Sequence, residues 1–182
     1  VLIHQFYLLA SLDEGLNPLG ALGLSHMGWR GNTLWDADLW MFRAVLPLWP
    51  ELAKAMLCFR RSTLGAAYDN ARRLGYSGAC YPWSADENGQ ERAAYVYHYQ
   101  HHVSIWIVMG FREYHQATDD LEFLREEGWP VVKGIADFWV SRTILEADGR
   151  RHIRGVLGPD EAVAETGQGV CDDHYLTNLG AI

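Results

Sequence analysis

The chain has 182 residues, of which 49% are hydrophobic and 21% charged, a balance typical of one folded globular domain rather than a disordered chain. The net charge of −8 argues against a nucleic-acid partner, because phosphate binding requires a basic surface. Three widely spaced cysteines exclude a disulfide framework and a zinc site of the CxxC type. No apolar run approaches the roughly 20 residues that span a bilayer, so we expect no membrane partner.

Aromatic residues are abundant, with eight Trp, nine Tyr and six Phe. They fit either a large core or a site whose flat rings stack on sugars or bases. The chain begins without Met, and its last residues, HYLTNLGAI, are typical of a helix that is only beginning. We therefore expect the chain to be a piece of a longer protein.

Helices are predicted in the first half of the chain at residues 2–11, 33–50 and 51–75, with a Gly-rich loop at 12–33. In the helix predicted at 33–50, apolar residues recur at spacings that alternate between four and three residues, which predicts one apolar stripe. The third is expected to be continuous, because Pro50 stands at its start and Gly75 at its end. The apolar stripe comprises Trp35, Leu39, Phe42, Leu46 and Trp49.

A long aromatic loop is expected at residues 75–97, and loops of this length in compact domains are usually functional. Helices should follow at 99–117, at 121–127 with Gly128 ending it, and at 130–143 with Pro130 opening it. Asp148-Gly149 predicts a β-hairpin near 144–158. The sequence therefore predicts an all-α fold of paired antiparallel helices, with one hairpin inserted.

Asp36 lies beside Trp35 at the start of the helix predicted at 33–50. One interpretation is local: Thr33 caps the helix and Asp36 is its third residue, where the helix dipole favours a negative charge. The other is functional: the carboxylate accepts hydrogen bonds from sugar hydroxyls while indole rings cover the apolar face of the sugar. The local pattern leaves both open.

Trp83 follows Pro82, which restricts its backbone, so its ring is either presented to a ligand or buried as an anchor of the loop. His98 and His102 have the spacing of helical metal ligands. The general-base Glu of an HExxH motif is replaced by Tyr99, and no third ligand is evident. We expect no metal there, and a polar helix start that faces a cleft.

Glu161 follows a stiff Gly158-Pro159 bend and is the best candidate for an acid catalyst. Cleavage of a glycosidic bond needs a protonated carboxyl group, held rigidly near an apolar sugar face that raises its pKa. Asp160 points elsewhere if the backbone is extended, so the two acids do not form a catalytic pair. An ordinary acidic turn is the alternative that the local pattern leaves open.

Taken in order, these segments resemble glycoside hydrolase family 65, which contains acid trehalases, kojibiose hydrolases and the maltose, trehalose and kojibiose phosphorylases. The resemblance covers essentially the whole chain. The segments that carry it are GLSHMGWRGNTLWDADLWM, AAYDNARRLGYSGACYPW, YQHHVS, WPVVKGIADFWVSR, VLGPDE and DDHYLTN.

The resemblance implies an (α/α)6 barrel, of which residues 1–182 supply roughly the first half of the catalytic domain. An N-terminal β-sandwich and the second half of the barrel would lie outside the chain. Apolar stripes such as Trp35, Leu39 and Phe42 would then be exposed and favour self-association, which leaves a homo-oligomer open.

Matched by position, Glu161 corresponds to the family's general acid. Trp35 and Asp36 correspond to the residues that hold the non-reducing glucose, and Trp83 to the Trp of its P-W-E-S loop. The further candidates for substrate binding, from the segments YQHH and GPDE, are Gln100, His101, His102 and Asp160.

The family acts by inversion, which needs a second group about 6.5–9.5 Å from the acid. In its hydrolases this group is a Glu and in its phosphorylases a bound phosphate, and both determinants would follow Ile182. The sequence departs from the family at three positions: Ser84 and Gln100 replace Glu, and Ala162 replaces Tyr. The glucose site therefore looks intact, while the side that holds the leaving group differs.

The expected function is an inverting hydrolase of α-linked glucosides of the trehalose or kojibiose type, which needs no cofactor. One alternative is a disaccharide phosphorylase that uses inorganic phosphate. An alternative from another class is a non-catalytic, sugar-binding helical protein. In each case the expected partner is a small carbohydrate.

Overall fold

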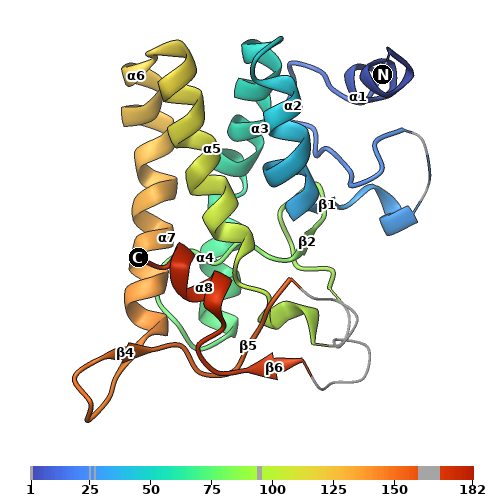
Figure 1. Cartoon of the computed structure of the whole chain (residues 1–182). Helices are drawn as coiled ribbons and strands as arrows, with labels where there is room; N and C mark the ends of the chain where they lie inside the picture. Colours follow the sequence, from blue (N-terminus) through green and yellow to red (C-terminus); the bar gives the residue numbers. More distant parts are fainter. Residues whose placement is uncertain (1, 25, 27, 94–95, 160–168) are drawn as a thin grey trace.

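The computed structural model describes residues 2–24, 26, 28–93, 96–159 and 169–182. Figure 1 shows long helices standing side by side, with the segments β4, β5 and β6 beneath them. The α-helices of the described residues are α1 (Leu2–Ala10), α2 (Phe42–Val45), α3 (Pro50–Ser62), α4 (Leu64–Arg73), α5 (Val103–Thr118), α6 (Leu121–Phe123), α7 (Trp129–Arg142) and α8 (Tyr175–Gly180).

Four short helical segments of other types join these helices. Two are 3-10 turns and two are π-helical, and both π-helical segments continue directly into an α-helix. They are η1 (Gly28–Gly31), η2 (Ala37–Met41), η3 (Tyr97–Tyr99) and η4 (Leu124–Gly128).

The strands are two residues long and pair antiparallel, two by two. The pair β3–β4 is the hairpin that the sequence predicts, closed by the loop 146–150 with Gly149 at a φ of +79°. The other two pairs were not predicted. The pairs are β1 (Thr33–Leu34) with β2 (Ser84–Ala85), β3 (Ile144–Leu145) with β4 (Arg151–His152), and β5 (Val156–Leu157) with β6 (Val170–Cys171).

Several helix boundaries differ from the predicted ones. The helix expected at 33–50 begins at Ala37, because Thr33–Leu34 form β1, and α2 ends at Val45. The helix expected at 51–75 is interrupted at Thr63, whose hydroxyl donates back to the carbonyl oxygen of Phe59 at 3.0 Å. Gly128 does not end a helix, since its backbone is helical and η4 runs directly into α7. A Cβ at Gly128 would lie 2.8 Å from the ring of Phe111, so the glycine serves a close approach between helices.

The core lies between α2, α3, α5 and α7. Phe42 is only 1% exposed, so the expectation that the stripe of Trp35, Leu39 and Phe42 would be open to solvent is wrong at Phe42. Trp35 and Leu39 are half-buried. The largest apolar side chains that are almost fully buried include Trp83, Tyr81, Phe42, Phe111, Phe138 and Ile107.

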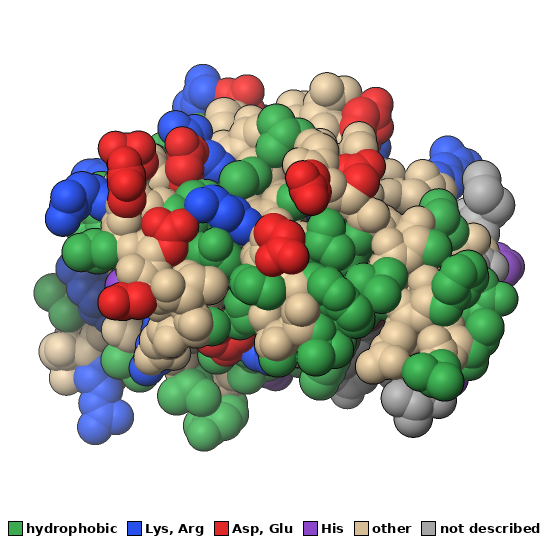
Figure 2. All heavy atoms as spheres, turned by 90° about the horizontal axis from the view of Figure 1, so that it is seen from above, with side chains coloured by type: hydrophobic (Ala, Val, Ile, Leu, Met, Phe, Trp, Pro, Cys, Tyr) green, Lys and Arg blue, Asp and Glu red, His purple; other side chains and the backbone are tan. Residues whose placement is uncertain are grey.

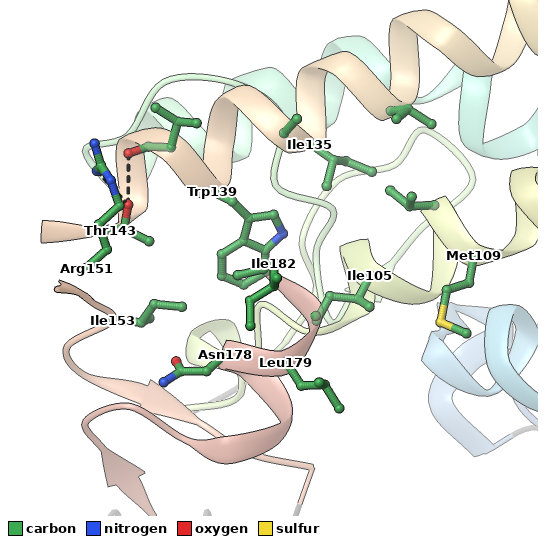
Figure 3. Close-up of a pocket in the computed structure, with 16 residues that line it drawn as sticks. Ile105, Met109, Ile135, Trp139, Thr143, Arg151, Ile153, Asn178, Leu179 and Ile182 are labelled. Carbon is green, nitrogen blue, oxygen red and sulfur yellow. Dashed lines mark hydrogen bonds between the residues drawn. The ribbon is translucent and has the colours of Figure 1, made fainter.

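Exposed apolar side chains gather elsewhere on the molecule. Helix α1 buries none of its residues, and apolar side chains gather on the right of Figure 2, the side on which α1 lies in Figure 1. A second apolar surface is a groove of about 730 Å³ between α5, α7 and α8 (Figure 3), where Ile105, Ile135 and Leu179 line its walls. Within the described ranges, no helix has the length and apolar character needed to cross a membrane.

Candidate active site

The β1–β2 ladder brings together two loops that are about 50 residues apart in the chain. Leu34 pairs with Ser84, and the Asn32 side-chain amide donates to the Ser84 hydroxyl at 3.1 Å. Trp35 follows one strand of this ladder and Trp83 precedes the other. Two segments that the sequence singled out separately therefore lie side by side.

A pocket of about 320 Å³ opens beside this ladder, at the lower end of the usual range for small-molecule sites. Asp36 and Trp35 line it, and so does Pro159 of the stiff bend that precedes Glu161. The pocket thus joins the loop before η2 to the chain that follows β5. The full lining is Ala21, Leu22, Trp29, Leu34, Trp35, Asp36 and Pro159.

The capping interpretation of Asp36 is wrong, because Thr33 lies in β1 and Asp36 itself occupies the N-cap position of η2 without a side-chain capping bond. Its carboxylate caps no amide of the first helical turn and interacts with the backbone amide of Asp36 itself. Burial raises the pKa of Asp36, and the nearby carboxylate of Asp38 adds to the rise. A half-buried carboxylate at a pocket is suited to accept hydrogen bonds from a ligand.

A buried ion pair that was not predicted from the sequence supports the segment behind Asp36. The Arg60 guanidinium donates to both carboxylate oxygens of Asp38, at 3.0 Å and 2.6 Å. The Tyr81 hydroxyl in turn donates to the Arg60 carbonyl at 2.6 Å. The Asp-Ala-Asp pattern was the signal that could have found it: Asp36 faces the pocket and Asp38 faces α3.

Trp83 is 2% exposed, so its ring anchors the loop rather than lying open at the pocket. It stacks on Tyr97, with ring centroids 4.4 Å apart, and meets the edge of Trp29 at 5.4 Å. The Glu91 carboxylate fixes the backbone here by accepting from the amides of Trp83 at 3.2 Å and Ser84 at 3.3 Å. Trp83 therefore does not line the pocket itself, but its ring contacts Trp29, which does.

The segment 100–102 is buried, and its side chains diverge. His102 meets the Trp35 ring edge-on at 5.6 Å, which places it behind the pocket. His101 packs instead against Phe138 of α7 at 5.4 Å. Burial lowers the pKa of His101 to about 3 and that of His102 to about 4, so both rings are neutral at physiological pH.

Several buried polar atoms of Trp83 and of the segment 100–102 have no hydrogen-bond partner within the described part of the chain. They include both amide atoms of Gln100, one ring nitrogen of His101, both ring nitrogens of His102 and the indole nitrogen of Trp83. Buried polar groups are nearly always paired, so water or a bound ligand is expected to satisfy these atoms.

Glu161 and Asp160 lie outside the described residues. The chain on both sides of them is described: β5 precedes them, β6 follows, and the two strands pair. The His174 ring packs so closely on Gly158 that a Cβ there would overlap it. The two ends of the segment are therefore held together.

The larger groove of Figure 3 is not a second candidate site. Its lining is mostly apolar, and Arg151 is its one charged residue among those described. A groove without a carboxylate or a histidine lacks the groups for acid–base chemistry. Among the described residues there is also no group of three or more His, Cys, Asp or Glu that could hold a metal ion.

A helical domain with a half-buried carboxylate in an aromatic-walled pocket has the features of a carbohydrate-active enzyme. The chain belongs to glycosyl hydrolase family 65, because the model of that family's central catalytic domain matches residues 1–182. Enzymes of this family need no cofactor, and phosphate is a co-substrate of its phosphorylases.

Relatives of more than one activity are similar to the chain. A kojibiose hydrolase of Mucilaginibacter mallensis is 36% identical over 163 residues, which cover 88% of this chain and 23% of that protein. A protein-glucosylgalactosylhydroxylysine glucosidase of Mus musculus is 36% identical, covering 82% and 22%. A kojibiose phosphorylase of Thermoanaerobacter brockii is 35% identical, covering 86% and 22%. The chain thus spans about a quarter of the length of these relatives.

The structure is similar to that of a candidate kojibiose phosphorylase from the human microbiome. The TM-score is 0.84 at 27% identity, and the match covers 94% of this chain and 25% of that one. The all-α prediction is confirmed, and the helices belong to the family's (α/α)6 barrel.

Proposed function

We propose that the complete protein cleaves an α-linked glucoside of the trehalose or kojibiose type with inversion, and that Glu161 is the general acid. Residues 1–182 would form part of its catalytic domain. The observation that carries the proposal is the pocket that Asp36 and Trp35 share with Pro159. It joins the predicted glucose-holding residues to the bend that leads into the predicted acid.

Chain geometry supports a place for Glu161 at this pocket. Glu161 follows Pro159 by two residues, and two residues of chain span at most about 7 Å. In the proposed mechanism the non-reducing glucose lies against Trp35, with its hydroxyls bonded to Asp36. Glu161 gives its proton to the glycosidic oxygen as the bond from that oxygen to the anomeric carbon breaks.

The nucleophile attacks the anomeric carbon from the opposite face, so the configuration inverts. For hydrolysis, a carboxylate outside this chain takes a proton from the attacking water. For phosphorolysis, phosphate attacks directly and glucose 1-phosphate is released. Hydrolases and phosphorylases are both similar to the chain. The residues on the leaving-group side of the pocket therefore have to distinguish hydrolysis from phosphorolysis.

The residue changes on the side of the pocket that would hold the leaving group favour hydrolysis. Ser84, in place of the family's Glu, is 2% exposed, and its hydroxyl accepts a hydrogen bond from Asn32. It therefore supplies no charge to a leaving sugar. The segment LSHMGWRG and the replacement of Glu by polar residues also resemble the hydrolase branch.

Proton NMR of fresh reaction mixtures with kojibiose and trehalose tests the proposal. In buffer that contains no phosphate, we expect the glucose unit whose anomeric bond is attacked to appear first as the β-anomer, while the leaving glucose of trehalose appears as the α-anomer. Release of β-glucose 1-phosphate only when phosphate is added would show the phosphorylase alternative. Binding of glucose without turnover of any α-glucoside would show the non-catalytic alternative.

A further inference from the structure

Trp29 lies in an unusual turn beside the pocket. Its φ is +57°, and that of the next residue, Arg30, is +54°, followed by Gly31 at +76°. The left-handed region is disfavoured for side chains other than glycine, and tryptophan is among the bulkiest. Such conformations persist only where the surroundings enforce them, and they gather at functional sites.

The surroundings of this turn do enforce it. The amide of Asn32 donates to the Trp29 carbonyl at 2.9 Å, and the Asn32 side chain is itself held by Ser84. A Cβ at Gly20 would lie 3.2 Å from the Cα of Gly31, so the loop at 20 packs directly on the turn. The strain is therefore maintained by two neighbouring segments.

The turn places the indole of Trp29 at the pocket. Trp29 shares the lining with Asp36 and Trp35, and the rings of Trp29 and Trp83 meet edge-on at an interplanar angle of 82°. Trp29 is 49% exposed, whereas Trp83 is 2% exposed. One part of the indole is thus anchored by a buried ring, and the rest is open.

We propose that Trp29 is a sugar-contacting residue that determines the specificity of this pocket: its indole packs against the apolar C–H face of a bound pyranose. A ring with only equatorial hydroxyls, such as glucose, offers flat C–H faces, whereas an axial hydroxyl projects from one face. Stacking of the indole on the face from which an epimer's axial hydroxyl projects would therefore favour glucose over that epimer. The inference rests on the sugar-binding part of the proposed function, and not on the role of Glu161.

Binding of D-glucose and D-galactose to the complete protein, measured by isothermal titration calorimetry, tests this inference. We expect Trp29→Ala to weaken glucose binding by about tenfold or more, with Trp29→Phe close to wild type, since an aromatic face remains. The preference for glucose over galactose should fall in parallel. Trp129→Ala is the matched control, because Trp129 is 60% exposed and lies outside the lining of the pocket.

A Trp29→Gly variant separates binding from folding. Glycine adopts positive φ readily, whereas alanine does not, so this variant should melt at or above the temperature of Trp29→Ala while glucose binding is weakened to the same extent. Unchanged glucose affinity in both Trp29→Ala and Trp29→Gly would overturn the inference. So would a loss of affinity no larger than that of Trp129→Ala.

The outcomes also separate this inference from the proposed function. A wild-type protein that binds no pyranose would overturn both. Full disaccharide turnover by Glu161→Gln would overturn the proposed catalytic role alone. Weakened glucose binding by Trp29→Ala would then still support the inference.

Discussion

Replacing Arg60 by Met should destabilise the protein strongly, because it leaves the Asp38 carboxylate buried and without its partner. Arg60 is 1% exposed and Asp38 9%, and two hydrogen bonds join them. Breaking a buried pair in this way costs about 3–5 kcal/mol. Each kcal/mol lowers the melting temperature by about 2–4 °C for a cooperative unit of 150–250 residues and by less for a larger one, so we expect a fall of several degrees and at most about 20 °C.

Differential scanning calorimetry of the complete protein measures this shift. Arg43→Met is the matched control: Arg43 also lies 2.7 Å from a carboxylate, that of Glu113, but the two side chains are 30% and 26% exposed. A partly exposed pair is worth at most about 1 kcal/mol. The double variant Arg60→Met, Asp38→Leu should recover much of the loss, since no buried charge remains. Equal shifts for Arg60→Met and Arg43→Met would refute the reasoning.

Three further predictions concern the site. Gly158→Ala should lower kcat, measured by steady-state kinetics, because a Cβ would overlap the His174 ring and displace the bend that precedes Glu161. An unchanged kcat would argue that the bend does not position the acid. Asp36→Asn should abolish glucose binding and leave stability at pH 7 equal or higher, because burial already disfavours the charged carboxylate. Titration calorimetry measures the binding and scanning calorimetry the stability. A clear loss of stability would contradict this prediction. The pKa values of His101 and His102 are lowered to about 3 and about 4, so their contribution to stability is complete above pH 6.5 and is lost as the pH falls below 6.5 toward those values. Denaturant titrations should show the free energy of unfolding falling on the order of 1 kcal/mol per pH unit for each ring. A flat profile from pH 6.5 to 4.5 would contradict this.

The helices were largely predictable from the sequence because their apolar residues recur at helical spacing. The hairpin was predictable because Asp148-Gly149 is a strong turn signal. Gly128 misled the prediction because glycine usually ends a helix, whereas here it allows Phe111 to approach α7. The interruption at Thr63 was not predictable, since threonine occurs within helices as well as between them.

The site was predictable only in part. Its residue types pointed to Asp36 and Trp35, yet the contact that brings them near Trp83 is a pairing of two-residue strands, too short to show alternation. Trp29 was missed because positive φ leaves no trace in the sequence at a tryptophan. The neighbouring Gly31 was the only local hint of a left-handed turn.

The central claim is that Glu161 protonates the leaving group of a glucoside whose glucose lies against Asp36 and Trp35. Turnover of Glu161→Gln on two substrates tests it most directly: a natural α-linked disaccharide, and α-glucosyl fluoride, whose leaving group needs no proton. The account predicts a loss of about 10²–10⁴-fold on the disaccharide, with far less loss on the fluoride. Disaccharide turnover near the wild-type rate would contradict it.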